Sequence, residues 1–149
     1  MSDRVTRDGR EEFEFWLSDM DDALERFFGR VPSAIRSRLD FSPESLDVLE
    51  AWVLERYAST DALVKPEAKE TVDGLARYVG ETYRKAIGGK WEIRFDDPGY
   101  AYYGLPQLTG FSPRPTPIAP HSLVTASADR RTGSYWRTVL ENTRKRLAK

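Results

Sequence analysis

The side chains in this chain that could do acid–base chemistry are few and lie far apart. Glu81 follows a glycine, Asp96 and Asp97 stand together before a proline, and His121 is the only histidine. Glu81 could act as a general base where a helix meets a sheet, and His121 could join a serine and an acid in a hydrolytic triad. The pattern therefore leaves open a small hydrolase that uses Glu81, Asp97 or His121.

Each of these residues also has a structural interpretation. The segment Asp96–Gly99 is typical of a turn in which aspartate accepts a hydrogen bond from nearby backbone. Gly80, beside Glu81, would let another segment pack closely on the helix, since a helical glycine otherwise costs about 1 kcal/mol. A lone histidine after a proline-rich loop is more often a loop residue that caps backbone groups. The structural interpretations are the stronger ones, and we predict no catalytic residue.

Composition excludes several kinds of site. The chain has no cysteine, which excludes disulfides, thiol catalysis and cysteine-bound zinc. One histidine cannot build a multi-histidine metal site, and no second acidic cluster has metal-ligand spacing. The glycine-rich phosphate loops and the Gly-x-Ser-x-Gly elbow are absent from the sequence. We therefore predict no metal and no cofactor.

Residues suited to binding a partner are easier to find. Tyr100, Tyr102 and Tyr103 follow the predicted turn, and Arg94 precedes it. Such aromatic residues could anchor a protein partner or stack on nucleic-acid bases, although strands favour aromatic side chains for packing alone. With Glu81, these four residues are the predicted binding residues.

Charge is distributed unevenly along the chain. The net charge is −1, but residues 1–30 hold nine acidic and five basic side chains, whereas residues 130–149 hold seven basic and one acidic. The near-neutral total argues against an anionic membrane or a nucleic acid as the partner. The acidic helix over 11–28 is a second candidate contact surface for a basic protein partner. The basic C-terminal helix leaves open an accessory role on nucleic acid.

Helices are predicted in the first part of the chain, where they would position these residues. Apolar residues recur every three or four positions over 11–28, 43 to about 58, and 66–87. Ser42 before Pro43 is typical of a helix start, and Gly88 is typical of a helix end. Residues 1–10 show no such pattern, and we expect them to be flexible.

Strands are predicted after residue 89. Apolar residues alternate over 90–96, and the turn that follows would bring 100–103 back as an antiparallel strand. In the rest of the chain we predict a short third strand over 105–111 and a proline-rich loop over 112–120. Residues 123–126 could be strand or helix, and a final helix is predicted from about residue 134 to the C-terminus. The order predicts one α+β domain over 1–149: three N-terminal helices, a small antiparallel sheet and a C-terminal helix.

The block Tyr78-Val79-Gly80-Glu81, followed by Gly88-Gly89-Lys90-Trp91, resembles small bacterial domains of unknown function. Some of these domains are suspected immunity proteins of contact-dependent toxin systems. The resemblance extends over residues 70–105 and implies an interaction module rather than an enzyme, with no catalytic residue to carry over.

The combined expectation is a non-catalytic module that binds a protein partner, with an immunity-type role as one form of it. The absence of cysteine, of a signal peptide and of an apolar run of about 20 residues favours the cytoplasm and no membrane. The excess of arginine over lysine is typical of a GC-rich bacterial genome. The sequence leaves the oligomeric state and the identity of the partner open.

Overall fold

The computed structural model describes the backbone of residues 2–111 and 116–148 and the side chains of residues 9–111 and 116–148. These residues form an α+β fold, which confirms the predicted class. Among them, no helix is both long and apolar enough to cross a membrane. The helices are α1 (Ser2–Ser18), α2 (Met20–Phe28), α3 (Ser33–Arg36), α4 (Pro43–Arg56), α5 (Thr60–Leu63), the 3₁₀ helix η1 (Pro66–Ala68), α6 (Lys69–Ile87), α7 (Pro120–Arg130) and α8 (Tyr135–Leu147), and the strands are β1 (Lys90–Glu92) and β2 (Gln107–Thr109).

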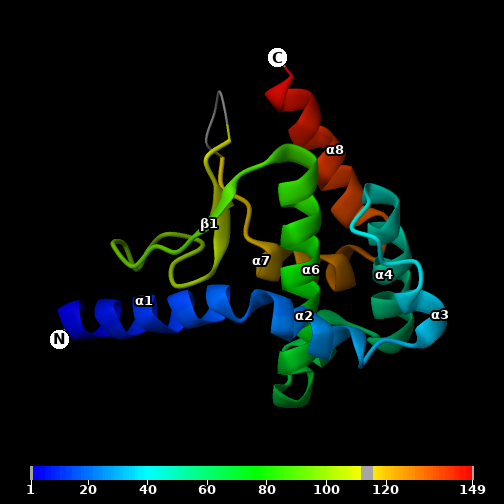
Figure 1. Cartoon of the computed structure of the whole chain (residues 1–149), viewed down its shortest axis with the longest axis horizontal. Coiled ribbons are helices and arrows are strands. Elements are labelled where there is room, and N and C mark those ends of the chain that lie inside the picture. The colour runs from blue at the N-terminus through cyan, green and yellow to red at the C-terminus, as the bar shows by residue number, and fades with distance from the viewer. Residues whose placement is uncertain (1, 112–115, 149) are drawn as a thin grey trace.

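Helix α6 is the central element of the fold. Figure 1 shows it running through the middle of the molecule, with α2 crossing it and with α4 and α8 on one side. Leu75, Tyr78 and Val79 on this helix have no exposed surface. A helix that buries residues around most of its circumference belongs in a core. Helix α6 therefore sets where the surrounding elements lie.

Local signals set several helix boundaries. The hydroxyl oxygen of Ser42 accepts a hydrogen bond from the backbone N–H of Ser45 (3.2 Å), and Pro43 is the first residue of α4. Gly88 ends α6 with a φ of 82°, in the left-handed region that glycine adopts readily. These caps confirm the predicted start at Pro43 and the predicted end at Ile87.

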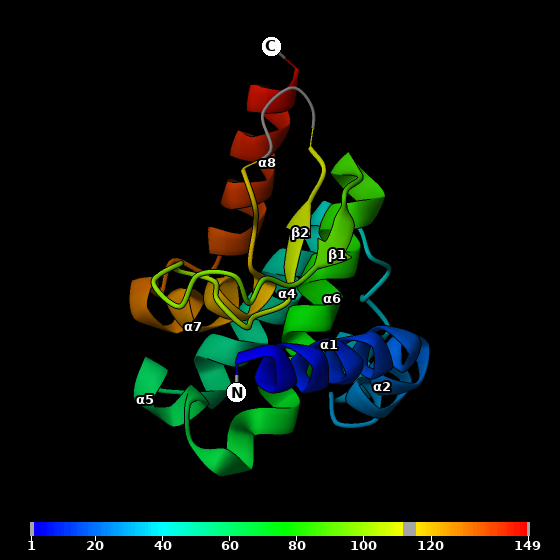
Figure 2. The ribbon, with the colours of Figure 1, turned by 90° about the vertical axis from the view of Figure 1, so that its left-hand side faces the viewer.

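The N-terminal helix differs from the prediction in two ways. Helix α1 begins at Ser2 rather than near Glu11, and the helix is interrupted at Asp19 before α2 continues. The ring of Phe95 packs directly on Gly9, so a distant loop covers the first half of α1. Figures 1 and 2 show this loop beside α1. A tertiary contact thus supports a helical segment that has no apolar stripe of its own.

The predicted tyrosine hairpin is wrong. Strand β1 is shorter than expected and pairs antiparallel with β2, with Trp91 opposite Leu108. The tyrosine segment forms consecutive turns, in which the N–H of Tyr100 donates to the carbonyl oxygen of Asp97 and the N–H of Tyr103 donates to that of Tyr100. These local bonds occupy backbone groups that a ladder with β1 would need.

The segment 123–126, which the sequence left open between strand and helix, belongs to α7. Pro120 lies in the first turn of that helix, where its missing N–H costs no hydrogen bond. Just before it, Ile118 exchanges two backbone hydrogen bonds with Leu108 of β2 (2.7 and 3.0 Å). The first four residues of the predicted proline-rich loop 112–120 lie outside the described residues.

A buried glutamate caps the last helix. Glu50 on α4 is fully buried, and its carboxyl oxygens accept hydrogen bonds from the backbone N–H groups of Tyr135 (3.0 Å) and Trp136 (2.9 Å) at the start of α8. Ser134, which precedes α8, makes no side-chain cap bond. Burial raises the pKa of Glu50, and the two N–H donors do not fully offset that effect.

Gly80 lets β1 and α7 approach α6 closely, as the sequence predicted. A Cβ at this position would overlap the indole ring of Trp91 and would come 3.2 Å from Cγ of Pro120. Trp91 is buried, as are Trp52 and Trp136, whereas Trp16 is half-buried.

We expect Gly80→Ala to lower the free energy of unfolding by about 1–3 kcal/mol, because the new methyl group overlaps Trp91. In an unhindered helix the same replacement of glycine by alanine would instead raise the free energy of unfolding by about 1 kcal/mol. Urea unfolding of Gly80→Ala, of Trp91→Leu and of the double variant Gly80→Ala/Trp91→Leu would measure the energetic coupling between residues 80 and 91. A Gly80→Ala protein more stable than the wild type would contradict the close approach.

We expect Glu50→Ala to destabilise the fold by about 2–4 kcal/mol, because two buried N–H groups lose their acceptor. Glu50→Gln should cost less, since one acceptor oxygen remains. Because the pKa of Glu50 is higher in the folded protein than in the unfolded chain, its contribution to the free energy of unfolding is complete at pH values below its unfolded-state pKa. That contribution is lost as the pH rises through its folded-state pKa. The difference in unfolding free energy between wild type and Glu50→Gln should therefore narrow with rising pH, and a widening difference would contradict the assignment.

Candidate functional site

A pocket of about 930 Å³ lies between α2, the segment from α5 to the start of α6, and α7. Helix α2 contributes Phe27 and Arg26, the opposite wall contributes Leu63 and Lys69, and His121 of α7 lies at one end. The volume is within the range of about 300–1,000 Å³ that is usual for small-molecule sites. We call this feature the cationic pocket, because four of its lining side chains are basic: Arg26, Arg30, Lys65 and Lys69.

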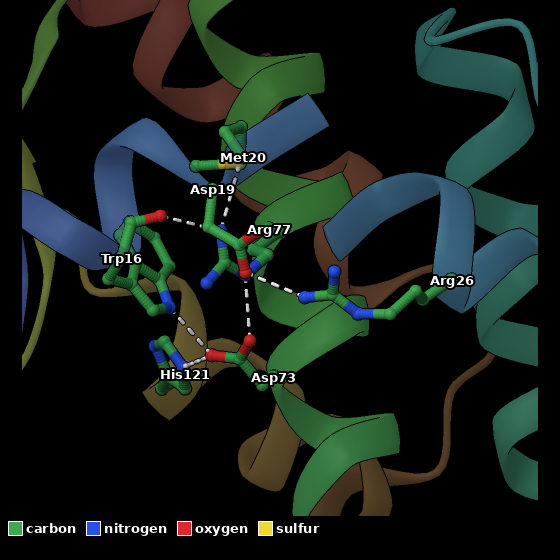
Figure 3. Close-up of polar contacts among 7 residues, drawn as sticks. All are labelled: Trp16, Asp19, Met20, Arg26, Asp73, Arg77 and His121. Carbon is green, nitrogen blue, oxygen red and sulfur yellow. Dashed lines mark hydrogen bonds and ion pairs between the residues drawn. The ribbon is translucent and has the colours of Figure 1, made fainter. Parts of the chain in front are cut away.

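Asp73 of α6 is the polar centre of the pocket wall. One carboxylate oxygen accepts hydrogen bonds from Nε1 of Trp16 (2.8 Å) and lies 3.1 Å from Nε2 of His121, and the other accepts from Nε of Arg77 (2.7 Å). Figure 3 shows Asp73 between these three side chains. The carboxylate thus joins α1, α6 and α7 at one point.

Arg77 is the buried member of this cluster. Its guanidinium donates to the backbone oxygen of Trp16 (2.8 Å) and lies 4.2 Å from the centroid of the Trp16 ring, while the residue is only 3% exposed. Its ion pair with Asp73 compensates the charge that burial removes from water. Arg77 therefore attaches α1 to the central helix.

The ionisation of Asp73 follows from these contacts. Burial alone would raise the pKa of this carboxyl, but hydrogen bonds from His121, Arg77 and Trp16, with the positive charge of Arg77, hold its pKa well below the usual range. Asp73 is therefore a fixed carboxylate at neutral pH and does not donate or take up protons there.

His121 lies in the first turn of α7 rather than in a loop, which corrects the sequence interpretation. Nε2 faces Asp73, and Nδ1 is buried without a hydrogen-bond partner among the described residues. A general base needs a nitrogen that a substrate proton can reach. In this geometry Nε2 is engaged by Asp73 and Nδ1 is buried, so neither nitrogen is placed to take a proton from a substrate, and His121 holds Asp73.

The other two candidate catalytic residues have separate partners. Glu81 forms an ion pair with Arg84 one turn along α6 (2.8 Å). Asp97 accepts a hydrogen bond from the N–H of Gly99 (2.9 Å), which is the turn geometry predicted for it. Among the described residues, no hydrogen bond or ion pair joins Glu81, Asp97 and His121 to one another.

The predicted aromatic binding residues pack on each other. Tyr100 donates its hydroxyl hydrogen to Oε1 of Gln107 (2.7 Å), and the guanidinium of Arg94 lies 4.3 Å from the Tyr100 ring centroid. Tyr102 meets Tyr100 edge to face, and Tyr103 does the same with Phe95. All three tyrosines are half-buried.

Arg94 also pairs with Asp96 (2.8 Å) and holds the pKa of that carboxyl below its usual range. These residues hold their own loop together.

The basic C-terminal region is partly used inside the fold. Arg131 donates to the backbone oxygens of Leu54 (2.8 Å) and Tyr57 (3.1 Å) at the end of α4, and Arg137 forms an ion pair with Asp47 (2.8 Å). The last turns of α8 carry exposed basic residues: Arg144, Lys145 and Arg146.

The outward side of α1 and α2 is a second candidate surface. Phe15 is 70% exposed, the most exposed large apolar side chain noted among the described residues. The exposed residues at helical spacing around it are mainly acidic, and we call this set, with Phe15, the acidic face: Glu11, Glu14, Ser18, Asp21, Asp22 and Glu25. Phe15 falls between the apolar positions of the predicted stripe, and that displacement is the sequence signal that could have identified it.

Comparisons of the chain with models of protein families, with curated proteins and with solved structures found no match. The resemblance to immunity-type domains therefore stays a prediction.

We expect Asp73→Asn to lower the free energy of unfolding by about 2–3 kcal/mol, because Arg77 would stay buried without its counter-charge. The value is below that of a fully buried pair, since the Asp73 side chain is 34% exposed. Chemical denaturation at neutral pH would measure it, with Asp96→Asn, an exposed pair, as the control that changes little.

The wild type and Asp73→Asn also allow a test of how stability depends on pH. The lowered pKa of Asp73 means that its contribution is present above the unfolded pKa of about 3.9 and is lost as the pH falls through the folded pKa. The stability of the wild type should therefore fall toward that of Asp73→Asn in acid. A difference that stays constant down to about pH 2 would contradict the role of the ionised carboxylate.

Proposed function

We propose that this chain is a non-catalytic module that binds a basic protein partner through its acidic face. The observation that carries the proposal is the exposed Phe15 side chain among carboxylates on the outward side of α1 and α2. A few large side chains that become buried at the centre of an interface commonly contribute most of the protein–protein affinity.

The charges of the acidic face support a basic partner. Glu14, Asp21, Asp22 and Glu25 form no ion pair with any side chain that the structure describes. Like charges at this spacing repel one another and slightly destabilise the free helix. A positively charged partner would relieve that repulsion on binding and would be attracted from a distance, which raises the association rate.

The resemblance in the block Tyr78–Trp91 suggests what the partner is. An immunity-type role would make the partner a basic bacterial toxin, and the cytoplasm would be the compartment in which the two meet. Acidic surfaces suit this role because many toxins are basic nucleases.

The alternatives have weaker support. A small hydrolase would need Glu81, Asp97 or His121 near a common substrate, and the contacts of these three residues lie in different parts of the fold. A nucleic-acid accessory role would rest on the end of α8, a short exposed basic segment. Neither has an anchor comparable to Phe15.

The test compares partner capture by wild-type protein and two variants in lysate of the native host. We expect Phe15→Ser to weaken binding of the captured basic protein by roughly 30-fold, the loss typical of a central anchor. Glu14→Lys/Asp22→Lys should weaken it further and remove its dependence on salt. Calorimetry with the purified partner would give the dissociation constants.

A double charge reversal on α4, Glu44→Lys/Glu55→Lys, is the matched control, since both residues are exposed and lie away from the acidic face. Equal loss in the control and the acidic-face variant would overturn the proposal. Turnover of an esterase, phosphatase or nuclease substrate that disappears in Glu81→Gln, Asp97→Asn or His121→Ala would favour the hydrolase instead. Salt-sensitive binding of nucleic acid would favour the accessory role.

A further inference from the structure

The cationic pocket has no part in the proposed contact with a protein partner. Its floor is apolar: Ala23 and Phe27 of α2 and Leu63 of α5 are buried there, and Val64 beside them is 64% exposed. Val64 therefore adds apolar surface at the edge of the pocket, and ligand pockets are lined mainly by apolar side chains.

The basic side chains of the pocket come from two walls. Arg26 lies in the last turn of α2, Arg30 lies in the turn that follows this helix, and Lys65 and Lys69 lie on the opposite wall. Arg26 pairs with Asp19, and Arg30 pairs with Glu70. Neither lysine forms an ion pair with a side chain within the described part of the chain.

The acidic residues of the pocket do not cancel this charge. Glu70 is engaged by Arg30. Asp73, beside His121, already accepts hydrogen bonds from Trp16, Arg77 and His121, so its charge is balanced by groups of the protein. The two lysines therefore supply uncompensated positive charge beside an apolar floor.

We propose that the cationic pocket binds a small amphipathic anion, with its acidic head group at Lys65 and Lys69 and its apolar body over Phe27, Leu63 and Val64. The pocket volume of about 930 Å³ accommodates a molecule of that kind. Lysine side chains hold an anionic head group as point charges, without requiring one planar shape. A carboxylate and a phosphate monoester share this chemistry, and the probes below separate them.

The test uses three probes that have the same ten-carbon chain and different head groups: decanoate, decanol and decyltrimethylammonium. Titration of the full chain, followed by amide NMR shifts, should show saturable binding of decanoate with shifts concentrated at Ala23, Leu63 and Thr125. We expect decanol to bind about tenfold more weakly and decyltrimethylammonium more weakly still. Decyl phosphate tests whether the pocket prefers a carboxylate or a phosphate head group.

Charge reversal at the head-group site makes the prediction specific. Lys65→Glu/Lys69→Glu should lose about tenfold or more in affinity for decanoate and should gain affinity for decyltrimethylammonium. The matched control, Lys90→Glu/Lys145→Glu, changes two exposed lysines outside the pocket and should bind decanoate like the wild type. Val64→Ser tests the apolar floor without adding a charge, at a position that is 64% exposed, and it should weaken binding of all three probes.

Equal affinity for the three head groups, equal loss in the two double variants, or no saturable shifts would overturn the proposal. Tighter binding of an acidic peptide than of decanoate would also overturn it, in favour of a protein ligand. The acidic-face variant Glu14→Lys/Asp22→Lys should still bind decanoate, so failure at the pocket is distinguishable from failure at the acidic face.

Discussion

The ion pair between Arg77 and Asp73 is the interaction on which the arrangement of this molecule depends. Arg77, a residue that is 3% exposed, lies on the central helix, where the carboxylate of Asp73 one turn earlier compensates the charge of its guanidinium. Both members of the pair also form hydrogen bonds to residues of other helices. Arg77 bonds the backbone oxygen of Trp16, and Asp73 bonds the Trp16 indole and the His121 ring. One compensated charge pair therefore positions α1 and α7 on α6.

Both candidate surfaces follow from that attachment. Helices α1 and α2 turn an apolar stripe toward α6, which leaves the acidic face on the outside and places Arg26 and Arg30 at the border of the pocket. The two charges adjoin on α2, where Arg26 lies four positions after Asp22 and therefore at the edge of the acidic face. The helix pair thus presents an acidic surface outward and places basic side chains where it borders the pocket.

Glycines on α6 allow the close packing that the network requires. Phe27 of α2 packs on Gly74, and Trp91 of β1 packs on Gly80, at distances that would not admit a Cβ. Trp91 in turn meets the ring of Trp16 edge to face, with centroids 4.9 Å apart. The aromatic contacts and the Asp73 network therefore meet at Trp16, which explains why a half-buried tryptophan connects so many elements.

The sequence by itself determined the fold class and the capped helix ends at Pro43 and Ile87, because these depend on interactions within a few residues. It did not predict the interruption at Asp19 or the short helices α3 and α5, so the N-terminal part contains more helices than the three expected. The Ser42 cap, the Gly88 stop and the close packing at Gly80 were all predictable. The same local reasoning paired the tyrosine segment with β1, whereas the true partner, β2, lies farther along the chain.

Only the tertiary structure decided which polar groups from distant parts of the chain meet. The Asp73–His121 contact spans 48 residues, and the bond from Trp136 to Glu50 spans 86. No spacing rule links such positions, because their approach depends on how whole helices pack. For the same reason, the sequence identified the acidic helix but not the cationic pocket, whose lining residues come from α1, α2, α5, η1, α6 and α7 and meet only after these helices have assembled.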